Sequence, residues 1–291
     1  MTHRFLEGLR PTVHIAHRGG AELAPENTLV AFRSAVERWR TQMLELDVHA
    51  TRDGELVVAH DATVDRCTDG TGPVAGFDWT GLAKLDAGYR FSPGGAESSV
   101  HPERSEAQSR GGPVCSGRTE VGPTAHPFRG QGVRIPRLVE VLRAFPDLRL
   151  NIELKAAGLE VAFASLVRGE RAFNRVCVGS EDDGVAARLH QALPEACHFY
   201  PRDALAAFVI AVKGHEPPPL DDRFTVLDMP LEFQGMRLFD AEFRDAAAAC
   251  GRWVNLWTID DAAEMRRLIA EGAGGIMTDR PDLLRAELDR T

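Results

Sequence analysis

Short apolar runs alternate along the chain with longer segments in which apolar residues recur every three or four positions. The short runs are typical of buried parallel strands, and the longer spacing is typical of amphipathic helices. Leu29, Phe32, Val36 and Trp39, for instance, share one face of a predicted helix. The expected strands cover residues 13–16, 43–48, 56–59, 149–154, 176–179, 197–200, 225–229, 253–258 and 275–277. The expected helices cover residues 29–39, 138–144, 159–168, 184–193, 204–212, 241–250, 262–271 and 281–288.

The repeated order of strand and helix indicates an α/β fold with a parallel sheet covered by helices. Roughly eight such units within about 250 residues fit a (β/α)8 TIM barrel. We therefore expect a single domain, spanning residues 10–291, in which the strands close into a barrel. A doubly wound open sheet is the alternative architecture that the same order allows.

One segment interrupts the alternation. Residues 93–132 are rich in Ser, Gly, Pro, Glu and Arg, and they follow neither the helical nor the strand period. So long an irregular connection is uncommon inside a compact domain, and its composition favours disorder. We interpret residues 94–124 as a flexible insertion within the barrel domain.

Composition narrows the range of partners. The 291 residues carry a formal net charge of −9, which argues against nucleic-acid binding because proteins of that class carry a basic surface. No run of about 18 apolar residues is present to span a membrane, and the first twenty residues lack the apolar core of a secretory signal. Five cysteines without C-x-x-C spacing indicate free thiols in a reducing compartment, so we expect a cytoplasmic protein. The oligomeric state is not indicated.

Two carboxylates interrupt one of the expected core strands. Glu45 and Asp47 are two positions apart, so they lie side by side on one face of the strand. Glu153 and Lys155 repeat this spacing on a later strand. Three buried carboxylates offer oxygen ligands that suit Ca²⁺ or Mg²⁺. The alternative is that Lys155 and Arg18 neutralise them without a metal.

Two histidines follow expected strands, at the edge where the active sites of barrels lie. His17 and His60 are candidates for a general acid and a general base because imidazole titrates near neutral pH. A single histidine in such a place is more often structural, but these two accompany Arg18 and Lys155, which suit an anionic group of oxygen atoms. The combination indicates phosphoryl chemistry on a phosphate ester.

Other residues near these groups have supporting interpretations. On strict alternation His49 shares the face of the paired carboxylates, so it is a possible partner of the residues that contact substrate. Trp257 ends an expected strand and would form an apolar wall against the carbon skeleton of the substrate. Asn27 is a plausible N-cap of the helix that follows. Gly19 and Gly20 would let the backbone approach a ligand closely.

A series of motifs occurs in a fixed order over about residues 13–285, outside the insertion. The motifs are IAHRGG, APENTLVAF, LELDVHATRDGELVVAHD, DRCTDGTG, GVRIPRLVEVL, NIELK, LWTID and GIMTDRPD. With these motifs the chain resembles the glycerophosphodiester phosphodiesterase family. HRG with PENT, then E-x-D, a following HD and I-E-x-K, all in register, make the resemblance specific.

The resemblance implies a (β/α)8 barrel that hydrolyses glycerophosphodiesters to glycerol 3-phosphate and an alcohol. It also implies roles for individual residues, with Glu26, the glutamate of PENT, placed near the site. One departure is Cys67-Thr68, where the family usually has Thr-Thr. The implied roles are general acid and base for His17 and His60, divalent-cation binding for Glu45, Asp47 and Glu153, phosphate binding for Arg18 and Lys155, and contact with the glycerol for Trp257.

Two other functions are compatible with the same motifs. A lysophospholipase D-like phosphodiesterase acting on lipids would need an apolar entry surface, which the polar insertion does not suggest. A catalytically silent barrel that binds phosphodiesters would be expected to lack one of the histidines or carboxylates, and none is missing. A barrel aldolase or isomerase is disfavoured because no Schiff-base context accompanies the paired histidines.

Overall fold

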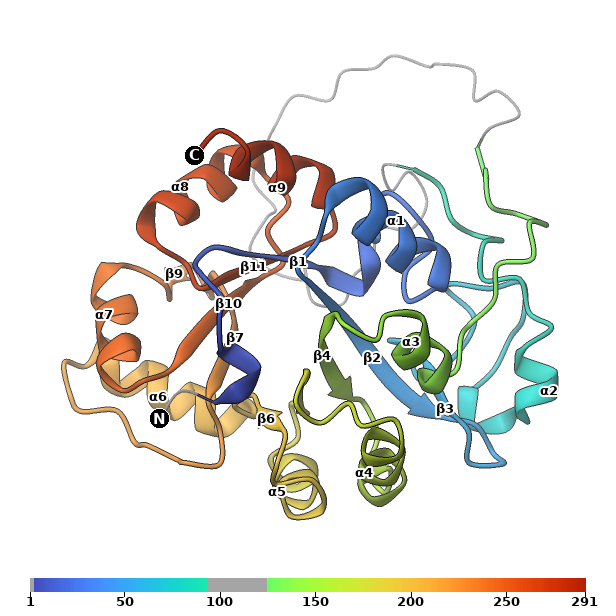
Figure 1. The fold of residues 1–291 in the computed structure, drawn as a ribbon, viewed down its shortest axis with the longest axis horizontal. Helices are drawn as coiled ribbons and strands as arrows, with labels where there is room; N and C mark the ends of the chain where they lie inside the picture. The colour runs from blue at the N-terminus through green and yellow to red at the C-terminus, as the bar shows by residue number, and fades with distance from the viewer. Residues whose placement is uncertain (1–2, 94–124) are drawn as a thin grey trace.

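The computed structural model describes residues 3–93 and 125–291. The insertion expected at residues 94–124 lies outside the described residues. Eight parallel strands form the centre of the molecule, and helices surround them (Figure 1). In barrel order the strands are β1 (Val13–Ala16), β2 (Met43–Ala50), β4 (Arg149–Leu154), β5 (Val176–Gly179), β6 (Cys197–His198), β7 (Val226–Pro230), β10 (Trp253–Trp257) and β11 (Gly275–Thr278).

The sheet closes between β6 and β7. Phe199 forms a parallel bridge to Val226. The backbone N–H of Tyr200 donates to the carbonyl oxygen of Val226 at 2.8 Å, and the N–H of Thr225 donates to the carbonyl of His198 at the same distance. Closure confirms the predicted TIM barrel and rules out the doubly wound open sheet.

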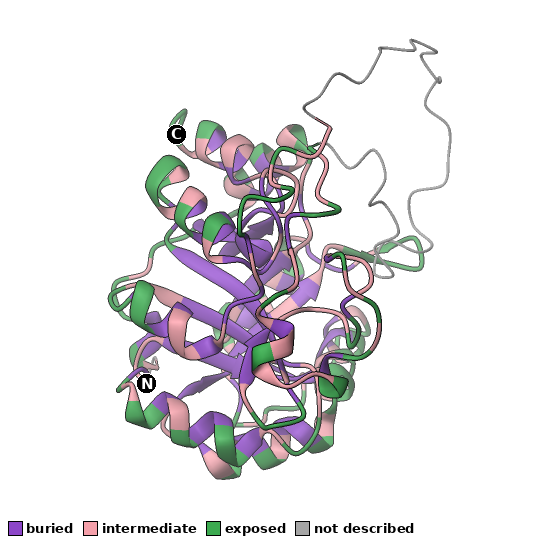
Figure 2. Ribbon diagram, turned by 90° about the vertical axis from the view of Figure 1, so that its right-hand side faces the viewer, coloured by how far each residue is buried: buried purple, intermediate pink, exposed green. Residues whose placement is uncertain are grey.

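Each barrel strand leads to a helix that covers the outer face of the sheet. The apolar stripe of each helix faces the strands, and its polar residues face solvent, as the burial colours show (Figure 2). This amphipathic pattern is why the helices could be located from sequence. The helices are α1 (Leu29–Trp39), α3 (Leu138–Ala144), α4 (Glu160–Gly169), α5 (Asp183–Ala192), α6 (Arg202–Lys213), α7 (Ala241–Ala249), α8 (Ala262–Glu271) and α9 (Pro281–Leu288).

A separate apolar cluster fills the inside of the barrel near the beginnings of the strands. Phe5 and Leu6, from the short 3₁₀ helix η1 (Arg4–Leu6), pack there against Val13 and Met43, which begin β1 and β2. Phe5 is 1% exposed, and burying such a side chain contributes roughly 1.5–3 kcal/mol. The N-terminal segment therefore closes the end of the barrel opposite the candidate site.

The strand at Leu56–Val58 (β3) differs from its predicted role. It pairs antiparallel with β2, with Val58 opposite Val48, so it is not one of the barrel strands. Its direction nevertheless carries the chain back along β2, where the N–H of Ala59 donates to the carbonyl of Asp47 at 3.0 Å. His60 thus reaches the site by an antiparallel return, not at the end of a parallel strand.

A small hairpin after β7 was not predicted. It consists of β8 (Glu232–Phe233) and β9 (Met236–Arg237), and the N–H of Leu238 donates to the carbonyl of Leu231 at its base. Two residues per strand are too few to produce a recognisable alternation. Because the hairpin follows the C-terminal end of a barrel strand, it belongs to the face on which barrel active sites lie.

Candidate active site

The turn after β1 brings Arg18 into the barrel. Arg18 has a left-handed backbone, with φ of 51°, and its N–H donates to Oε2 of Glu45 at 2.9 Å. Gly19 and Gly20 also have positive φ. A Cβ on Gly19 would lie 2.8 Å from that of Ala31, and one on Gly20 would lie 2.7 Å from Cγ of Pro281. The two glycines therefore allow close packing against α1 and α9.

His17 lies between two carboxylates at the end of β1. Its Nδ1–H donates to Oδ1 of Asp279 at 2.8 Å, and its Nε2 lies 3.8 Å from Oε2 of Glu45. Burial disfavours the imidazolium, but the charges of Asp279 and Glu45 outweigh it and raise the pKa of His17 to about 9. His17 consequently carries a proton at neutral pH.

Asp279 was not among the predicted site residues. It follows β11 directly, within the TDRP sequence, so its place at the C-terminal end of a barrel strand was an available signal. What sequence could not give is its contact with His17, which is 262 positions away in the chain.

His60 has a carboxylate partner of its own. Its Nδ1–H donates to Oδ1 of Asp61 at 2.7 Å, a hydrogen bond that fixes the orientation of the ring. His49, expected near the site, donates from Nε2 to the carbonyl oxygen of His60 at 3.1 Å. Burial lowers the pKa of His49, so its ring stays neutral. His49 therefore holds the backbone of His60 in place.

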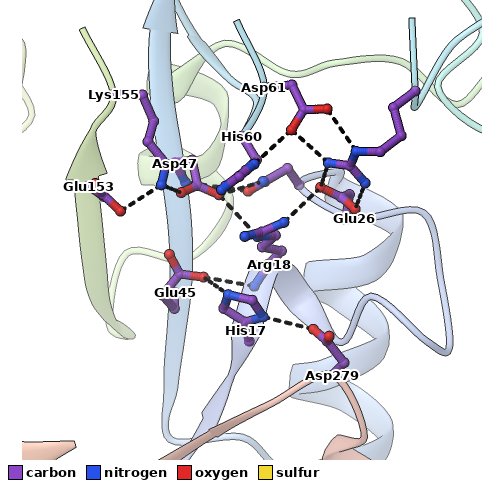
Figure 3. Close-up of polar contacts among 12 residues, drawn as sticks. His17, Arg18, Glu26, Glu45, Asp47, His60, Asp61, Glu153, Lys155 and Asp279 are labelled. Atoms are coloured by element: carbon purple, nitrogen blue, oxygen red, sulfur yellow. Dashed lines mark hydrogen bonds and ion pairs between the residues drawn. The ribbon is translucent and has the colours of Figure 1, made fainter. Parts of the chain in front are cut away.

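The three carboxylates predicted to bind a cation lie on the adjacent strands β2 and β4. Asp47 is directly opposite Glu153. The Lys155 ammonium lies 2.8 Å from Oε2 of Glu153 and 3.3 Å from Oδ1 of Asp47, and Nε of Arg18 lies 3.4 Å from Oδ2 of Asp47 (Figure 3). Pairing with Lys155 and Arg18, the alternative left open by the sequence, is therefore present. Across residues 3–93 and 125–291, no three histidine, cysteine or carboxylate groups converge closely enough to hold a metal ion.

The pKa values of these three carboxylates are shifted in different directions. Burial opposes ionisation of Asp47, but Lys155 and Arg18 outweigh it and lower its pKa. Burial and the charge of Asp47 raise the pKa of Glu45 to about 7. Burial also raises the pKa of Glu153, although Lys155 opposes the shift. Glu45, Asp47 and Glu153 offer the oxygen atoms that a hard divalent cation prefers, while Lys155 and Arg18 already neutralise Asp47.

A second guanidinium joins the two histidine-bearing parts of the site. Arg66 donates to both oxygens of Glu26, at 2.6 and 2.8 Å, and from Nε to Asp61 at 2.7 Å. Glu26 also lies 3.4 Å from Nη1 of Arg18. Burial opposes ionisation of Glu26, and the hydrogen bonds of Arg66 and the charge of Arg18 lower its pKa. Glu26 is therefore part of the site, as expected, and Arg66 was missed.

Asn27 also belongs to the site and does not cap the helix after it. Thr28 is the N-cap of α1, and its hydroxyl accepts from the N–H of Ala31. Asn27 has φ of 56°, a conformation that asparagine tolerates better than most residues, and its Nδ2 donates to Oδ2 of Asp47 at 2.9 Å. The predicted N-cap was thus wrong by one residue, and the amide instead orients a carboxylate.

Trp257 lies at the C-terminal end of β10, opposite Pro230 of β7. Its side chain is partly exposed and packs against the apolar cluster inside the barrel. It can therefore serve as an apolar surface at the mouth. Together, the site combines two imidazoles, each bonded to a carboxylate, with fixed cations, an arrangement able to donate and accept protons beside an anionic ester.

Comparison with known proteins gives one family. The glycerophosphoryl diester phosphodiesterase family matches residues 17–192, more than half of the chain. A glycerophosphodiester phosphodiesterase of Caldanaerobacter subterraneus is 29% identical over 287 residues, covering 94% of this chain and 96% of the relative. Human lysophospholipase D is 26% identical and covers 94% of this chain and 84% of the relative.

Solved structures share the fold. A glycerophosphoryl diester phosphodiesterase domain from Mycobacterium tuberculosis aligns with a TM-score of 0.78 at 23% identity, covering 96% of this chain and 99% of that one. A phosphodiesterase of Oleispira antarctica, solved with the product sn-glycerol 3-phosphate, aligns with a TM-score of 0.67 at 22% identity, covering 96% and 97%. Within the described ranges, no helix has the length and apolar character needed to cross a membrane.

Proposed function

The chain belongs to the glycerophosphoryl diester phosphodiesterase family and is a phosphoric diester hydrolase, and on this premise we propose that histidine acid–base catalysis cleaves glycerophosphodiesters to sn-glycerol 3-phosphate and an alcohol. The observation that carries the proposal is the pair of imidazoles, each bonded to its own carboxylate beside one charged cluster. The product named for the Oleispira structure supports the choice of substrate.

His17 is the general acid in this proposal. Asp279 and Glu45 outweigh burial and keep the pKa of His17 at about 9, so it can donate a proton to the departing alcohol at neutral pH. His60 is the general base in this proposal, with its ring oriented by the hydrogen bond from Nδ1–H to Asp61. The nucleophile is water or the 2-hydroxyl of the substrate's own glycerol. Isolation of a cyclic glycerophosphate would support the hydroxyl, and direct ¹⁸O incorporation without it would support water.

Arg18 and Lys155 are the proposed phosphate ligands. Both cations contact Asp47, and Lys155 is the more accessible, with 15% of its side chain exposed against 1% for Arg18. A phosphodiester brings one negative charge, which these cations can offset as charge develops on its oxygens. Trp257 would contact the carbon skeleton at the mouth of the barrel.

A divalent cation, Ca²⁺ or Mg²⁺, is the proposed cofactor. Glu45, Asp47 and Glu153 would hold it, and the support is that burial, together with the charge of Asp47, raises the pKa values of Glu45 and Glu153, two effects that a bound cation would offset. When bound, such an ion stabilises negative charge on phosphoryl oxygens.

The test is release of sn-glycerol 3-phosphate from glycerophosphocholine by wild-type protein and by His17→Ala, each with and without EDTA. We expect at least a hundredfold loss of kcat in the variant, in the range of general acid–base catalysis, and loss of activity in chelator that added Ca²⁺ or Mg²⁺ restores. Unchanged release in His17→Ala would remove the acid role, and unchanged release in EDTA would remove the cofactor. His215→Ala is the matched control, since that exposed histidine pairs with Glu242 on the surface.

One observation favours lysophospholipid hydrolysis as a second activity. Phe233 and Met236 face each other across the β8–β9 hairpin and are 57% and 52% exposed. They lie in the loop that follows the C-terminal end of β7, where exposed apolar side chains would contact the acyl chain of a lipid substrate. The relatives named lysophospholipase D are consistent with this.

The hairpin can be tested separately from the catalytic residues. Replacing both Phe233 and Met236 by Ser should reduce choline release from lysophosphatidylcholine several-fold and leave release from glycerophosphocholine unchanged. Val161→Ser, at a residue that is 76% exposed on α4, is the control. Unchanged choline release from lysophosphatidylcholine in the double variant, or an equal fall in release from both substrates, would remove the hairpin from lipid recognition.

A further inference from the structure

A polar group lies inside the barrel, one residue layer below the candidate site. Asp228 of β7 accepts from Nδ2 of Asn151 at 2.6 Å and from Nδ2 of Asn255 at 2.8 Å. Nε1 of Trp253 in turn donates to Oδ1 of Asn255 at 2.9 Å. Since β4 and β7 are not neighbours in the sheet, the contact between Asn151 and Asp228 crosses the interior of the barrel. We call Asp228, Asn151 and Asn255 the barrel floor.

The barrel floor lies directly beneath residues of the site. Asn151 is in register with Glu45, and it precedes Glu153 by two positions on the same face of β4. Asn255 precedes Trp257 by two positions on β10, where Asp228 is its register partner. A substrate seated between the carboxylates and Trp257 would therefore extend its inner end toward Asp228.

The barrel floor is incompletely satisfied. Asn151 is 2% exposed, yet its Oδ1 has no hydrogen-bond partner among the described residues. Asp228 keeps part of its surface accessible although both amides around it are buried. Within the described parts of the chain, no lysine, arginine or histidine pairs with Asp228. A carboxylate inside a barrel without a cation is costly, and an unfilled amide oxygen beside it indicates a partner that is brought by a ligand.

The chemistry of the barrel floor selects among the groups that a phosphodiester carries. Asp228 and Oδ1 of Asn151 can accept from a ligand, and each side-chain amide has a second N–H besides the one that it donates to Asp228. A hydroxyl group both donates and accepts. A quaternary ammonium has no N–H, and a primary ammonium cannot accept. Neighbouring hydroxyls on a short carbon chain fit this pattern best.

We propose that the barrel floor is the specificity subsite for the glycerol hydroxyls of the substrate, with Asp228 as the residue that accepts hydrogen bonds from them. This inference rests on the proposed glycerophosphodiester activity and adds to it the residue that selects the glycerol moiety. Trp257 would cover the carbon skeleton while Asp228 and Asn151 accept from its hydroxyls. A site built to bond a hydroxyl rejects the analogue that lacks it, because its own polar groups are then left unpaired.

The experiment measures binding, so it does not depend on which nucleophile attacks. Calorimetric titration compares sn-glycerol 3-phosphate with n-propyl phosphate, which has the same charged group and no hydroxyl. The proteins are the wild type, Asp228→Asn, and Asp245→Asn as control, a substitution on α7 of a side chain that is 69% exposed. Phosphoethanolamine is a third probe, and the activating divalent cation is present throughout.

We expect the wild type and the control to prefer sn-glycerol 3-phosphate by at least about tenfold, the usual value of a hydrogen bond to a charged group. Asp228→Asn should bring the ratio to within about twofold by weakening glycerol 3-phosphate alone. The variant should fold, because its amide resembles the protonated carboxyl in size and charge. A circular dichroism melt verifies this.

Three results for Asp228→Asn would overturn the subsite. These are an unchanged preference in Asp228→Asn, an equal weakening of both phosphates, or a loss confined to phosphoethanolamine, which would assign the carboxylate to a cationic head group. A wild type that binds both phosphates equally would also overturn it while leaving the phosphodiesterase activity intact. A wild type that binds neither and cleaves no glycerophosphodiester would overturn the proposed function itself.

Discussion

The same chemistry, a guanidinium or ammonium against a carboxylate, occurs in two regions of this molecule with opposite consequences. The rim cluster lies at the C-terminal ends of the barrel strands, and the shell pairs join neighbouring outer helices. In the rim cluster Arg18 is 1% exposed, whereas Arg143 in the shell is 68% exposed. The rim cluster comprises His17, Arg18, Glu26, Glu45, Asp47, His60, Asp61, Arg66, Glu153, Lys155 and Asp279; the shell pairs are Arg143–Glu170, Arg168–Glu195, Arg188–Glu160 and Lys213–Asp240.

Water explains the difference between the two regions. Exposed charges are screened, so a surface ion pair typically contributes between zero and about 1 kcal/mol. In the rim cluster the charges are desolvated, and one neighbour moves the pKa of another in either direction, up to about 9 for His17 and about 7 for Glu45. The rim cluster can therefore set protonation states for catalysis, whereas the shell pairs can only add a little stability.

The largest effect that would sharpen this comparison comes from Asp279→Asn. The amide keeps the size of the side chain but removes the charge that holds His17 protonated. We expect kcat to fall by roughly 10²–10⁴, the range of a misdirected general acid, and the pKa of His17 to fall from about 9, as measured by NMR titration.

Asp282→Asn is the matched control, because Asp282 lies three residues further on and contacts Arg280 without touching a histidine. Activity in Asp279→Asn within about threefold of that of the wild type would mean that charge in the rim cluster does not serve catalysis. The two regions would then differ only in burial.

Arg66→Met is next in expected size. The substitution leaves Glu26 and Asp61 without the guanidinium that joins them. We expect a loss of roughly 2–4 kcal/mol in the free energy of unfolding, as for a broken buried pair, and a fall in kcat of roughly 10–100-fold because His60 loses its fixed partner. Denaturant unfolding and steady-state kinetics measure the two effects.

Arg52→Met supplies the comparison from the surface. Arg52 bonds both oxygens of Asp78 in the same way, but its side chain is 62% exposed. We expect no measurable change in stability or activity. Similar losses in both variants would contradict the claim that burial decides the worth of these pairs.

The helices and strands could be predicted from sequence more fully than the contacts within the rim cluster. The apolar residues placed strands 13–16 and 149–154 at their observed bounds, because each of these barrel strands buries at least one apolar face. The spacing of Glu45 and Asp47 gave their shared face, since strand alternation is local. Predictions of this kind use only neighbours in the chain.

The features that sequence analysis missed depend on contacts between residues that are distant in the chain. Asp279 and Arg66 are ordinary charged residues in loops until the barrel brings them to His17 and Glu26. Asp228 is one acidic residue in an apolar strand, and only barrel closure gives it a partner on β4. β3 was misassigned because its pattern does not encode the direction in which it pairs.

Asp228→Asn tests, through the pH dependence of stability, whether the barrel floor behaves like the rim cluster or like the shell pairs. Burial raises the pKa of Asp228 from 3.8 to about 6, so the folded state disfavours its ionisation. Below pH 3.8 the carboxyl is protonated in both the folded and the unfolded state, so it does not change the free energy of unfolding. As the pH rises from 3.8 through about 6, the unfolded state loses this proton more readily than the folded state, and the free energy of unfolding falls. The Asn variant should therefore be more stable than the wild type by roughly 1–3 kcal/mol at pH 8 and about equal at pH 3.5.

Urea unfolding at the two pH values measures this difference. A gain in stability together with lost discrimination between glycerol 3-phosphate and propyl phosphate would identify Asp228 as a residue kept for function at a cost in stability. A variant that is less stable at pH 8 would mean that the carboxylate supports the barrel interior, and the barrel floor would then resemble the shell more than the rim cluster.

The smallest effect is expected from the shell. Arg143→Ala removes a guanidinium that makes three contacts of 2.6–3.1 Å with Glu170, geometry as good as that of any pair in the rim cluster. Both partners lie at the surface between α3 and the end of α4, where water replaces the lost contacts. We expect kcat/KM to stay within about twofold of the wild type and the urea midpoint to shift by less than Arg66→Met shifts it.

Whatever shift does occur should shrink as salt is added, because a screened interaction weakens with ionic strength and a desolvated one does so much less. The informative measurement is therefore the pair of urea midpoints, for Arg143→Ala and Arg66→Met, at low and high salt. A salt-dependent loss at Arg143 and a salt-insensitive loss at Arg66 would separate the two regions by mechanism as well as by size. Equal salt dependence would mean that water reaches the rim cluster, and the pKa shifts on which its chemistry depends could not then be sustained.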